Sequence, residues 1–317
     1  MGQTAGGNQT AFAEFILLGF SDLSLQLQCF LFSLFLIIYI ITLWGNAMLI
    51  TVVTLNSALH TPMYYFLRNL SFLEVCYIST TLPNMLANIL MEDKSISFQG
   101  CAIQMYFFLF LGTTECFFLA VMAYDRYLAI CDPLHYTTIM SQTKCIHLVA
   151  GSWLGGIVLS MGQTGFIFSL SYCGANEIDH FFCDIPPVLK LACADTFLNE
   201  ITIFLVSVLI LLLPFLLILF SYVQIVSSIL RIRSAEGRQK AFSTCASHLI
   251  SVSLFYGTGM FTYLRPKSSH SSNSDKVLAL SYSVVTPMLN PFIYSLRNKD
   301  VKGALRQSIG RKLLTRM

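Results

Sequence analysis

The sequence predicts an all-α membrane protein, a bundle of seven transmembrane helices followed by a short amphipathic eighth helix. Hydrophobic residues make up 55% of the 317 residues, charged residues make up only 11%, and the mean hydropathy is +0.68. Soluble domains carry about 25% charged residues, so this chain has too few charges to cover a water-exposed surface. The composition excludes an ordinary cytosolic enzyme, a disordered protein and a nucleic-acid-binding protein.

Seven long apolar runs carry this prediction. A helix of about 20 apolar residues crosses the roughly 30 Å hydrocarbon core of a bilayer, and a chain inside lipid must satisfy its own backbone groups, so each run is expected to be a helix. Proline removes a backbone hydrogen bond, so we expect Pro214, Pro287 and Pro291 to kink the fifth and seventh helices. The runs are Cys29–Leu55, Leu70–Met91, Ala102–Met122, Ile146–Leu170, Ile201–Leu230, Ala241–Leu264 and Val277–Leu296.

The positive charges predict the orientation of the chain in the plasma membrane. If the N-terminus is extracellular, fourteen of the 19 Lys and Arg residues fall on the cytoplasmic side and five fall outside. Short loops rich in Lys and Arg stay in the cytoplasm, so this arrangement is favoured over its inverse. The sequon at Asn8 would then lie outside, where it is accessible to glycosylation.

Four of the ten cysteines lie on the side predicted to be extracellular. Cys173, Cys183 and Cys193 share the longest outer loop, and Cys101 opens the third run. Thiols oxidise outside the cytosol, so these four predict two disulfides, although the sequence alone allows three pairings. The other six cysteines lie in or near the membrane runs, where we expect small buried hydrophobes.

Six motifs follow one another in a fixed order along the predicted helices. They are Gly45–Asn46, Leu59–Leu67 (LHTPMYYFL), Met122–Tyr127 (MAYDRY), His180–Asp184 (HFFCD), Lys240–Leu249 (KAFSTCASHL) and Pro287–Tyr294 (PMLNPFIY). Together they closely resemble the olfactory (odorant) receptor family of rhodopsin-like G-protein-coupled receptors, over residues 15–303. The resemblance implies the disulfide pairs Cys101–Cys183 and Cys173–Cys193.

The resemblance implies a coupling site for a stimulatory, olfactory-type G protein that raises cyclic AMP. In this pattern Arg126 is held in the resting state, where Asp125 can offset its charge, and is released on activation; the alternative is an arginine that snorkels to the membrane boundary. Arg238 stands where other receptors carry an acid, so the usual ionic lock is not expected. The residues assigned to coupling and switching are Asp125, Arg126, Tyr127, Tyr222, Arg238, Lys240, Asn290, Pro291 and Tyr294.

Two acidic residues lie within apolar runs. Glu74 is in the second run and Glu115 in the third, and ionisable groups at such depth usually face the bundle interior. The resemblance places them in a polar cluster with Asn46 and Asn290, with a sodium ion as a candidate occupant and no other cofactor. We expect the cluster to have a structural and switching role.

The ligand is expected to bind in the outer half of the bundle, between the third, fifth, sixth and seventh helices. The resemblance assigns to this site the residues Phe108, Leu109, Gly112, Thr113, Val206, Ser207, Ile210, Tyr256, Gly259, Met260, Tyr263, Leu280 and Ser283. Tyr256 stands where many related receptors carry a switch tryptophan, and its hydroxyl needs a partner inside the bundle. These residues are apolar with scattered hydroxyls and lack a carboxylate, so we expect a small, neutral, volatile hydrophobe that binds in the micromolar range.

Other functions fit the sequence less well. A receptor of the same fold for an endogenous metabolite or a peptide stays open. A transporter or channel would need an inverted repeat or a second acid-lined path, and the sequence has neither. An enzyme would need a converging set of catalytic or metal-binding residues; His180 and Cys183 are the nearest to such a pair, and a disulfide explains Cys183 better.

The last residues predict a helix on the inner leaflet. After Asn298 the chain is basic and carries Val301, Ala304, Leu305 and Ile309 at helical spacing. No cysteine follows Cys245, which excludes a palmitate anchor there. The predicted domains are an extracellular N-terminus (1–24), a seven-transmembrane receptor domain (25–296), and a cytoplasmic eighth helix and tail (297–317).

Overall fold

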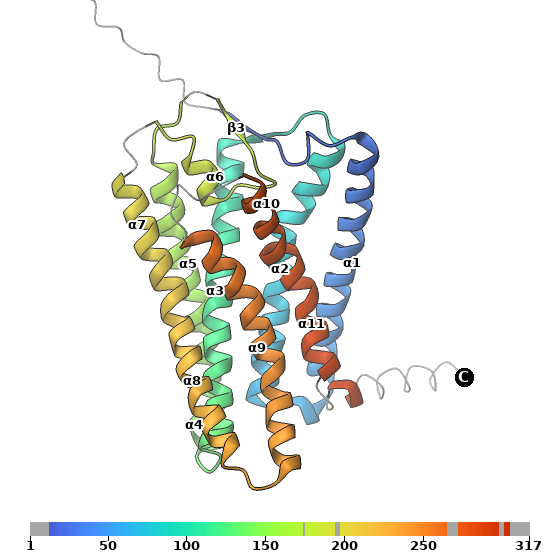
Figure 1. Cartoon of the computed structure of the whole chain (residues 1–317), viewed down its shortest axis with the longest axis vertical. Coiled ribbons are helices and arrows are strands. Elements are labelled where there is room, and N and C mark those ends of the chain that lie inside the picture. The colour runs from blue at the N-terminus through green and yellow to red at the C-terminus, as the bar shows by residue number, and fades with distance from the viewer. Residues whose placement is uncertain (1–12, 174, 194–196, 265–271, 298–300, 305–317) are drawn as a thin grey trace, which may run out of the picture.

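Long helices that run side by side dominate the structure (Figure 1). This computed structural model describes residues 13–173, 175–193, 197–264, 272–297 and 301–304. The long helices are α1 (Leu25–Leu55), α2 (Pro62–Leu90), α3 (Phe98–Cys131), α5 (Gln142–Phe168), α7 (Phe197–Ser207), α8 (Leu213–Leu230), α9 (Ala235–Tyr263), α10 (Ser272–Leu280) and α11 (Thr286–Arg297). The short helices η1 (Ser57–Leu59), α4 (Tyr136–Ile139) and α6 (Ile185–Leu189) lie in the connections.

Among the described residues, five helical segments are long and apolar enough to cross a membrane. They are Leu25–Leu55, Phe98–Cys131, Gln142–Phe168, Phe197–Leu230 and Ser274–Ser295. Large apolar side chains such as Trp44 (62% exposed) and Phe220 (61% exposed) point away from the bundle, as expected for a surface that contacts lipid. The helices α2 and α9, which contain the other two predicted runs, have 29 residues each.

Most helices extend beyond the apolar runs because capping residues determine their ends. The helix α2 begins at Pro62, and α3 begins after Ser97, whose Oγ accepts a hydrogen bond from Gly100 N at 3.0 Å. Ser234 does the same for α9, with a 3.2 Å bond from Gly237 N. These side chains satisfy first-turn N–H groups that have no partner within the helix. Polar caps therefore extend the helices into segments that hydropathy assigns to loops.

Two helices contain a π-helical segment shortly before a proline. The segment η2 (Val208–Leu212) joins α7 to α8 ahead of Pro214, and η4 (Ser281–Val285) joins α10 to α11 ahead of Pro287. A wider turn accommodates a residue that has no N–H to donate. Pro291 lies inside α11, and a Cβ added to Gly45 on α1 would be only 3.2 Å from its Cγ. Glycine at this position lets α1 and α11 approach closely.

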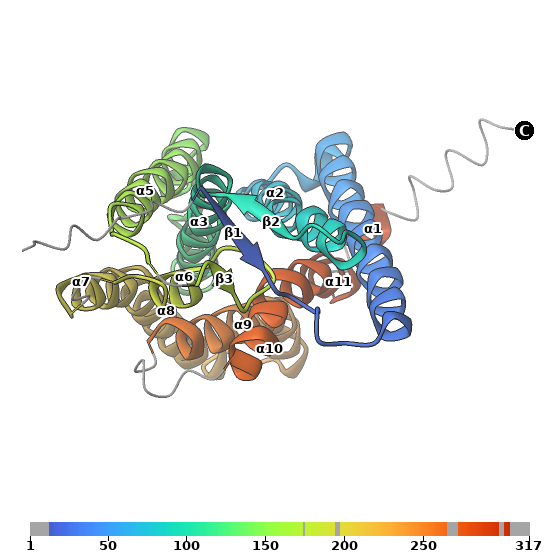
Figure 2. The same ribbon diagram turned by 90° about the horizontal axis from the view of Figure 1, so that it is seen from above.

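A small sheet covers one end of the bundle. The strand β1 (Glu14–Leu17) pairs antiparallel with β2 (Ser95–Ser97) and parallel with β3 (Glu177–Ile178), in the order β2-β1-β3. Figure 2 shows β1 crossing this end of the molecule, which we call the sheet end. Phe15 is fully buried and packs on the rings of Phe98 and Tyr172. The sequence indicated only an extracellular segment here, so the sheet is an addition to the predicted fold.

Two disulfides fix the loop that carries β3. Cys101 at the start of α3 is bonded to Cys183, with a Cα–Cα distance of 5.5 Å, and Cys173 is bonded to Cys193 at 5.7 Å. These are the pairs that the motif resemblance implied. They hold the loop from Cys173 to Cys193 over the sheet end of the bundle.

Some sequence predictions concern residues outside the described part of the chain. Asn8 and most of 297–317 fall there, so glycosylation and the eighth helix stay predictions. The described residues 301–304 form one helical turn in which Val301 and Ala304 are buried.

Candidate functional site

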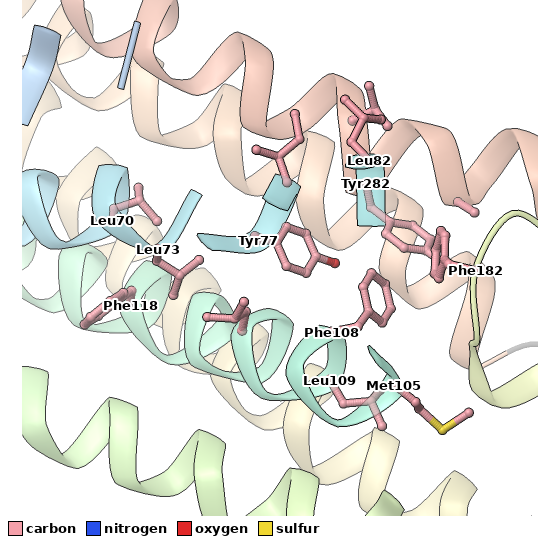
Figure 3. Close-up of a cluster of buried hydrophobic side chains, with 14 of the residues drawn as sticks. Leu70, Leu73, Tyr77, Leu82, Met105, Phe108, Leu109, Phe118, Phe182 and Tyr282 are labelled. Atoms are coloured by element: carbon pink, nitrogen blue, oxygen red, sulfur yellow. The ribbon is translucent and has the colours of Figure 1, made fainter. Parts of the chain in front are cut away.

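A cavity of about 60 Å³ lies inside the bundle near the sheet end. Phe108 on α3 is central to this region, with its ring 5.3 Å from that of Tyr77, 4.8 Å from that of Phe182 and 5.8 Å from that of Tyr282. Figure 3 shows these four aromatic residues gathered at one end of the buried cluster. The cavity wall consists of Tyr77, Phe108, Leu109, Gly112, Thr113, Cys116, Gln163, Ile185, Ser207, Ile210, Leu211, Phe255, Gly259, Tyr263 and Tyr282. None of these side chains is charged.

The sequence assigned many of these wall residues to the ligand site, but not all. The assigned residues that line the cavity are Phe108, Leu109, Gly112, Thr113, Ser207, Ile210, Gly259 and Tyr263. Tyr77 on α2 and Gln163 on α5 line it as well, from helices that the sequence analysis left out. A tyrosine and a glutamine within apolar runs were the available signal, because buried polar groups in membrane helices usually face the bundle interior.

The remaining assigned ligand residues lie elsewhere in the bundle. Tyr256 and Met260 line a separate crevice between α8 and α9, and the hydroxyl of Tyr256 donates to Cys116 O at 3.1 Å. Ser283 is buried and donates to Ala279 O at 2.6 Å within its own helix, while Val206 and Leu280 are half-buried. Tyr256 thus has the interior partner that its hydroxyl requires, and it is not one of the residues that line the cavity.

Asp184 lies next to the cavity wall, where it contacts the wall residues Ile185, Tyr263 and Tyr282. Its buried carboxylate accepts hydrogen bonds from the hydroxyls of Tyr263 and Tyr282, both at 2.9 Å, and from Ile185 N at 2.7 Å. Burial raises the pKa of this carboxyl, against the opposing effects of His180 and of the hydrogen bonds. Burial also lowers the pKa of His180, which favours the neutral ring. Two aromatic wall residues are therefore oriented by one carboxylate from the disulfide-bonded loop.

A polar cluster lies deeper between α1, α2, α3 and α11. Asn290 Nδ2 donates to Glu74 Oε1, Ser251 donates to Asn290 Oδ1 at 2.7 Å, and Asn46 Nδ2 donates to Thr42 O at 3.0 Å. Glu74 and Glu115 are both fully buried and interact electrostatically. Among the described residues, Glu74 Oε2, both Glu115 oxygens and Asn46 Oδ1 have no hydrogen-bond partner. The resemblance grouped Asn46, Glu74, Glu115 and Asn290. The structure brings into this region several side-chain oxygens that accept no hydrogen bond.

The opposite end of the bundle contains Arg126, which is only 4% exposed. Its Nη1 donates to Met122 O at 3.2 Å, and its Nε has no partner within the described part of the chain. Asp125 instead accepts a hydrogen bond from the Tyr136 hydroxyl at 2.8 Å, and burial raises the pKa of that hydroxyl. No ion pair joins Asp125 to Arg126 among the described side chains. Asp125 therefore anchors the short helix α4, and it interacts with Arg126 electrostatically, without a direct ion pair.

A histidine that the sequence analysis did not select connects three helices beside Arg126. His248 on α9 is fully buried; its Nδ1 lies 2.8 Å from the Tyr222 hydroxyl on α8, and its Nε2 lies 3.0 Å from Leu119 O on α3. We call Tyr222, His248 and Leu119 O the histidine bridge. The sequence did contain a signal for this residue, because His248 is a polar side chain within the apolar run Ala241–Leu264 and belongs to the motif Lys240–Leu249.

The other residues assigned to coupling differ in their surroundings. Tyr294 is buried with a hydroxyl that has no partner among the described residues, while Tyr127 is half-buried and stacks with Tyr124. Arg238 is exposed on the first turn of α9. The side chain of Lys240 is outside the described residues. The described part of the chain contains no cluster of three or more His, Cys, Asp and Glu side chains arranged to hold a metal ion.

Comparisons with known proteins give one consistent result. A profile of the olfactory receptor family matches residues 35–312. The chain is 53% identical to human olfactory receptor 10A7 over 310 residues, which are 98% of each chain. It is 56% identical to human olfactory receptor 10A4 over 306 residues (96% of this chain and 97% of the relative), and 50% identical to mouse olfactory receptor 5AR1 over 305 residues (96% and 98%).

Proposed function

The chain belongs to the olfactory receptor family, and on this premise we propose that it binds small, mostly hydrophobic volatile molecules and activates a stimulatory olfactory-type G protein. Members of this family are multi-pass plasma-membrane receptors for odorants that couple to G proteins, and they are not enzymes. The observation that supports the ligand class is the cavity, whose wall is mainly apolar and aromatic and carries no charged side chain. A neutral, apolar molecule can enter it without leaving an unpaired charge in a buried site.

We further propose that the chain crosses the membrane seven times, with the sheet end outside. The two disulfides at that end suit an oxidising compartment, and the opposite end holds Arg126 and most of the basic residues that the structure describes. The 29-residue lengths of α2 and α9 support crossings by these two helices as well. Antibody or protease access to tags at the two termini of intact cells tests this arrangement, which predicts that only the N-terminal tag is accessible.

The coupling proposal depends on movement at the end opposite the sheet. Arg126 is buried and interacts electrostatically with Cys245 and His248 of α9, so we expect α9 to move away from α3 when a G protein reaches it. A ligand favours such a state only when it contacts that state more strongly than the resting one. The helix α9 connects the ligand cavity to the end of the bundle that contains Arg126. Phe255 and Gly259 of this helix line the cavity, and His248 lies farther along the same helix, beside Arg126.

A panel of volatile compounds tests the function, with cyclic AMP measured in cells that express the receptor. We expect at least one neutral volatile compound to raise cyclic AMP in the wild type, and Arg126→Ala to abolish that rise at equal surface expression. Thr202→Val, on the lipid-facing side of α7, is the matched control and should respond like the wild type. An undiminished signal in Arg126→Ala would reject the coupling role.

For the polar cluster, we propose that Glu74, Glu115 and Asn46 hold a sodium ion. Hard cations prefer oxygen ligands, and the donor-free oxygens of these side chains provide them. An ion would also offset two carboxylates whose burial is otherwise costly. In this arrangement the cluster would stabilise the resting bundle.

A further inference from the structure

Three buried polar side chains line the cavity without forming a hydrogen bond. Thr113 on α3, Gln163 on α5 and Ser207 on α7 are 5%, 7% and 5% exposed. Within the described part of the chain, none of these side chains has a hydrogen-bond partner, and none of their polar atoms is completely enclosed by protein atoms. Their polar atoms therefore face the cavity. Most buried polar groups in proteins are hydrogen-bonded, so three exceptions on one wall need an explanation.

Two of the other hydroxyls on the cavity wall are already occupied. Tyr263 and Tyr282 donate to Asp184. The Tyr77 hydroxyl also lacks a partner, but Tyr77 is on α2, which lies on the other side of α3 from α5 and α7 (Figure 2). The unpaired groups of Thr113, Gln163 and Ser207 therefore mark the part of the cavity between α3, α5 and α7.

Helix geometry explains why these groups converge. Gln163 follows Gly156 by seven residues, about two turns, so both lie on one face of α5. A Cβ on Gly156 would collide with Thr114 Oγ1, so this face of α5 lies directly against α3. On α7 the buried residues are Ile203 and Ser207, four positions apart, so Ser207 lies on the face that contacts the bundle.

We infer that Thr113, Gln163 and Ser207 form a subsite for a neutral oxygen function, a carbonyl or a hydroxyl, on the ligand. This inference rests on the proposed function and specifies its ligand class. The glutamine amide provides both donors and an acceptor, and each hydroxyl can act as either. A ligand oxygen would satisfy polar groups that are otherwise left without partners in a buried site.

The same wall disfavours two other ligand classes. A hydrocarbon would fill the cavity but leave all three polar groups unpaired. A carboxylate or an ammonium would bring in a charge that no lining side chain neutralises. The remaining wall, which includes Phe108, Leu109 and Leu211, provides the apolar surface for the hydrocarbon part of the ligand. The inferred ligand is a ketone, aldehyde, ester or alcohol with an apolar body.

Compounds that share a skeleton and differ at one end test the inference. The first set is octane, 2-octanone, 1-octanol, octanoic acid and octylamine, and parallel sets have hexyl and phenylpropyl skeletons. We expect the neutral oxygenated members of the activating skeleton to raise cyclic AMP at concentrations at least about tenfold lower than its hydrocarbon and charged members. Gln163→Leu and Ser207→Ala should each raise the half-maximal concentration of the oxygenated compound about threefold to tenfold, as for one lost hydrogen bond.

The response to the hydrocarbon distinguishes a ligand contact from a structural defect. Neither substitution should change the half-maximal concentration of the hydrocarbon on the same skeleton, and Thr202→Val on α7 should change neither response. Gln163→Met, which keeps most of the side-chain volume, provides a second test if Gln163→Leu reaches the surface poorly. Equal potency of hydrocarbon and oxygenated compounds on the wild type, or equal shifts for both in the variants, would overturn the inference. A wild-type receptor at the surface that responds to no compound would instead reject the proposed function.

Discussion

The histidine bridge should hold the receptor in its resting state, and His248→Leu tests this directly. The substitution removes two buried hydrogen bonds, one of 2.8 Å to the Tyr222 hydroxyl and one of 3.0 Å to Leu119 O. Each buried bond contributes about 0.5–1.5 kcal/mol net, so the pair contributes about 1–3 kcal/mol. If α9 leaves α3 on activation, both bonds are lost in the active state, and their removal favours that state by about 5-fold to 150-fold.

The assay is cyclic AMP in cells without odorant, normalised to receptor at the cell surface. An active state that is populated at about 0.1–10% leaves room for this increase, so basal signalling should rise at least about threefold, the smallest rise applying to a population that starts near 10%. Tyr222→Phe removes only the first bond and should produce a smaller rise. Ser253→Ala, on the exposed face of α9, is the matched control and should leave the basal signal unchanged. A basal signal in His248→Leu at or below the wild-type level, at equal surface expression, would refute the reasoning.

Three other predictions concern stability. Burial raises the pKa of the Asp184 carboxyl, so the folded receptor retains a proton there at pH values at which the unfolded chain, with a pKa of about 3.9, has released it. The stability linked to that proton is present at low pH and is lost as the pH rises. The melting temperature of the wild type should therefore fall relative to that of Asp184→Asn as the pH is raised from about 4. Parallel pH profiles of the two melting temperatures would contradict this. Replacing potassium by sodium at constant ionic strength should raise the melting temperature of the purified wild type but not that of Glu115→Gln, and an equal rise in both would exclude Glu115 as a ligand. The Cys101–Cys183 disulfide spans 82 residues and Cys173–Cys193 spans 20, so chain entropy predicts losses of about 4.5 and 3.3 kcal/mol when they are removed. Cys101→Ser should therefore reduce surface expression more than Cys173→Ser does, and the reverse order would show that loop closure is not the main contribution.

The sequence was sufficient for the helical architecture, because lipid leaves few alternatives. An apolar run of about 20 residues in a bilayer must be helical whatever its neighbours are. Each predicted run accordingly coincides with helical segments of the structure, although Ser97 and Ser234 place helix starts ahead of the runs. The sheet was not predictable in the same way. Its three strands have at most four residues each and come from segments up to about 160 residues apart, so no local period marks them.

The direction that each helix faces was harder to predict than the helix itself. In a soluble protein an apolar stripe marks the buried face, but lipid is as apolar as the bundle interior, so an apolar side chain gives no such information. Gly259 lines the cavity while its neighbour Met260 lines the outer crevice, and hydropathy does not separate inner from outer positions on α9.

Polar and small residues carry the facing information that apolar residues lack. Glu74 and Glu115 were assigned to the interior because an ionisable side chain exposed to lipid would be too costly, and both are buried in the bundle. The same argument applies to Gln163 and His248, which were overlooked because no motif gave them a role. Gly156 adds a second kind of evidence, since a residue without a side chain allows α5 to approach α3 and so orients the face that carries Gln163. In a membrane bundle of this kind, the polar and small positions within apolar runs are therefore the ones from which helix rotation should be predicted.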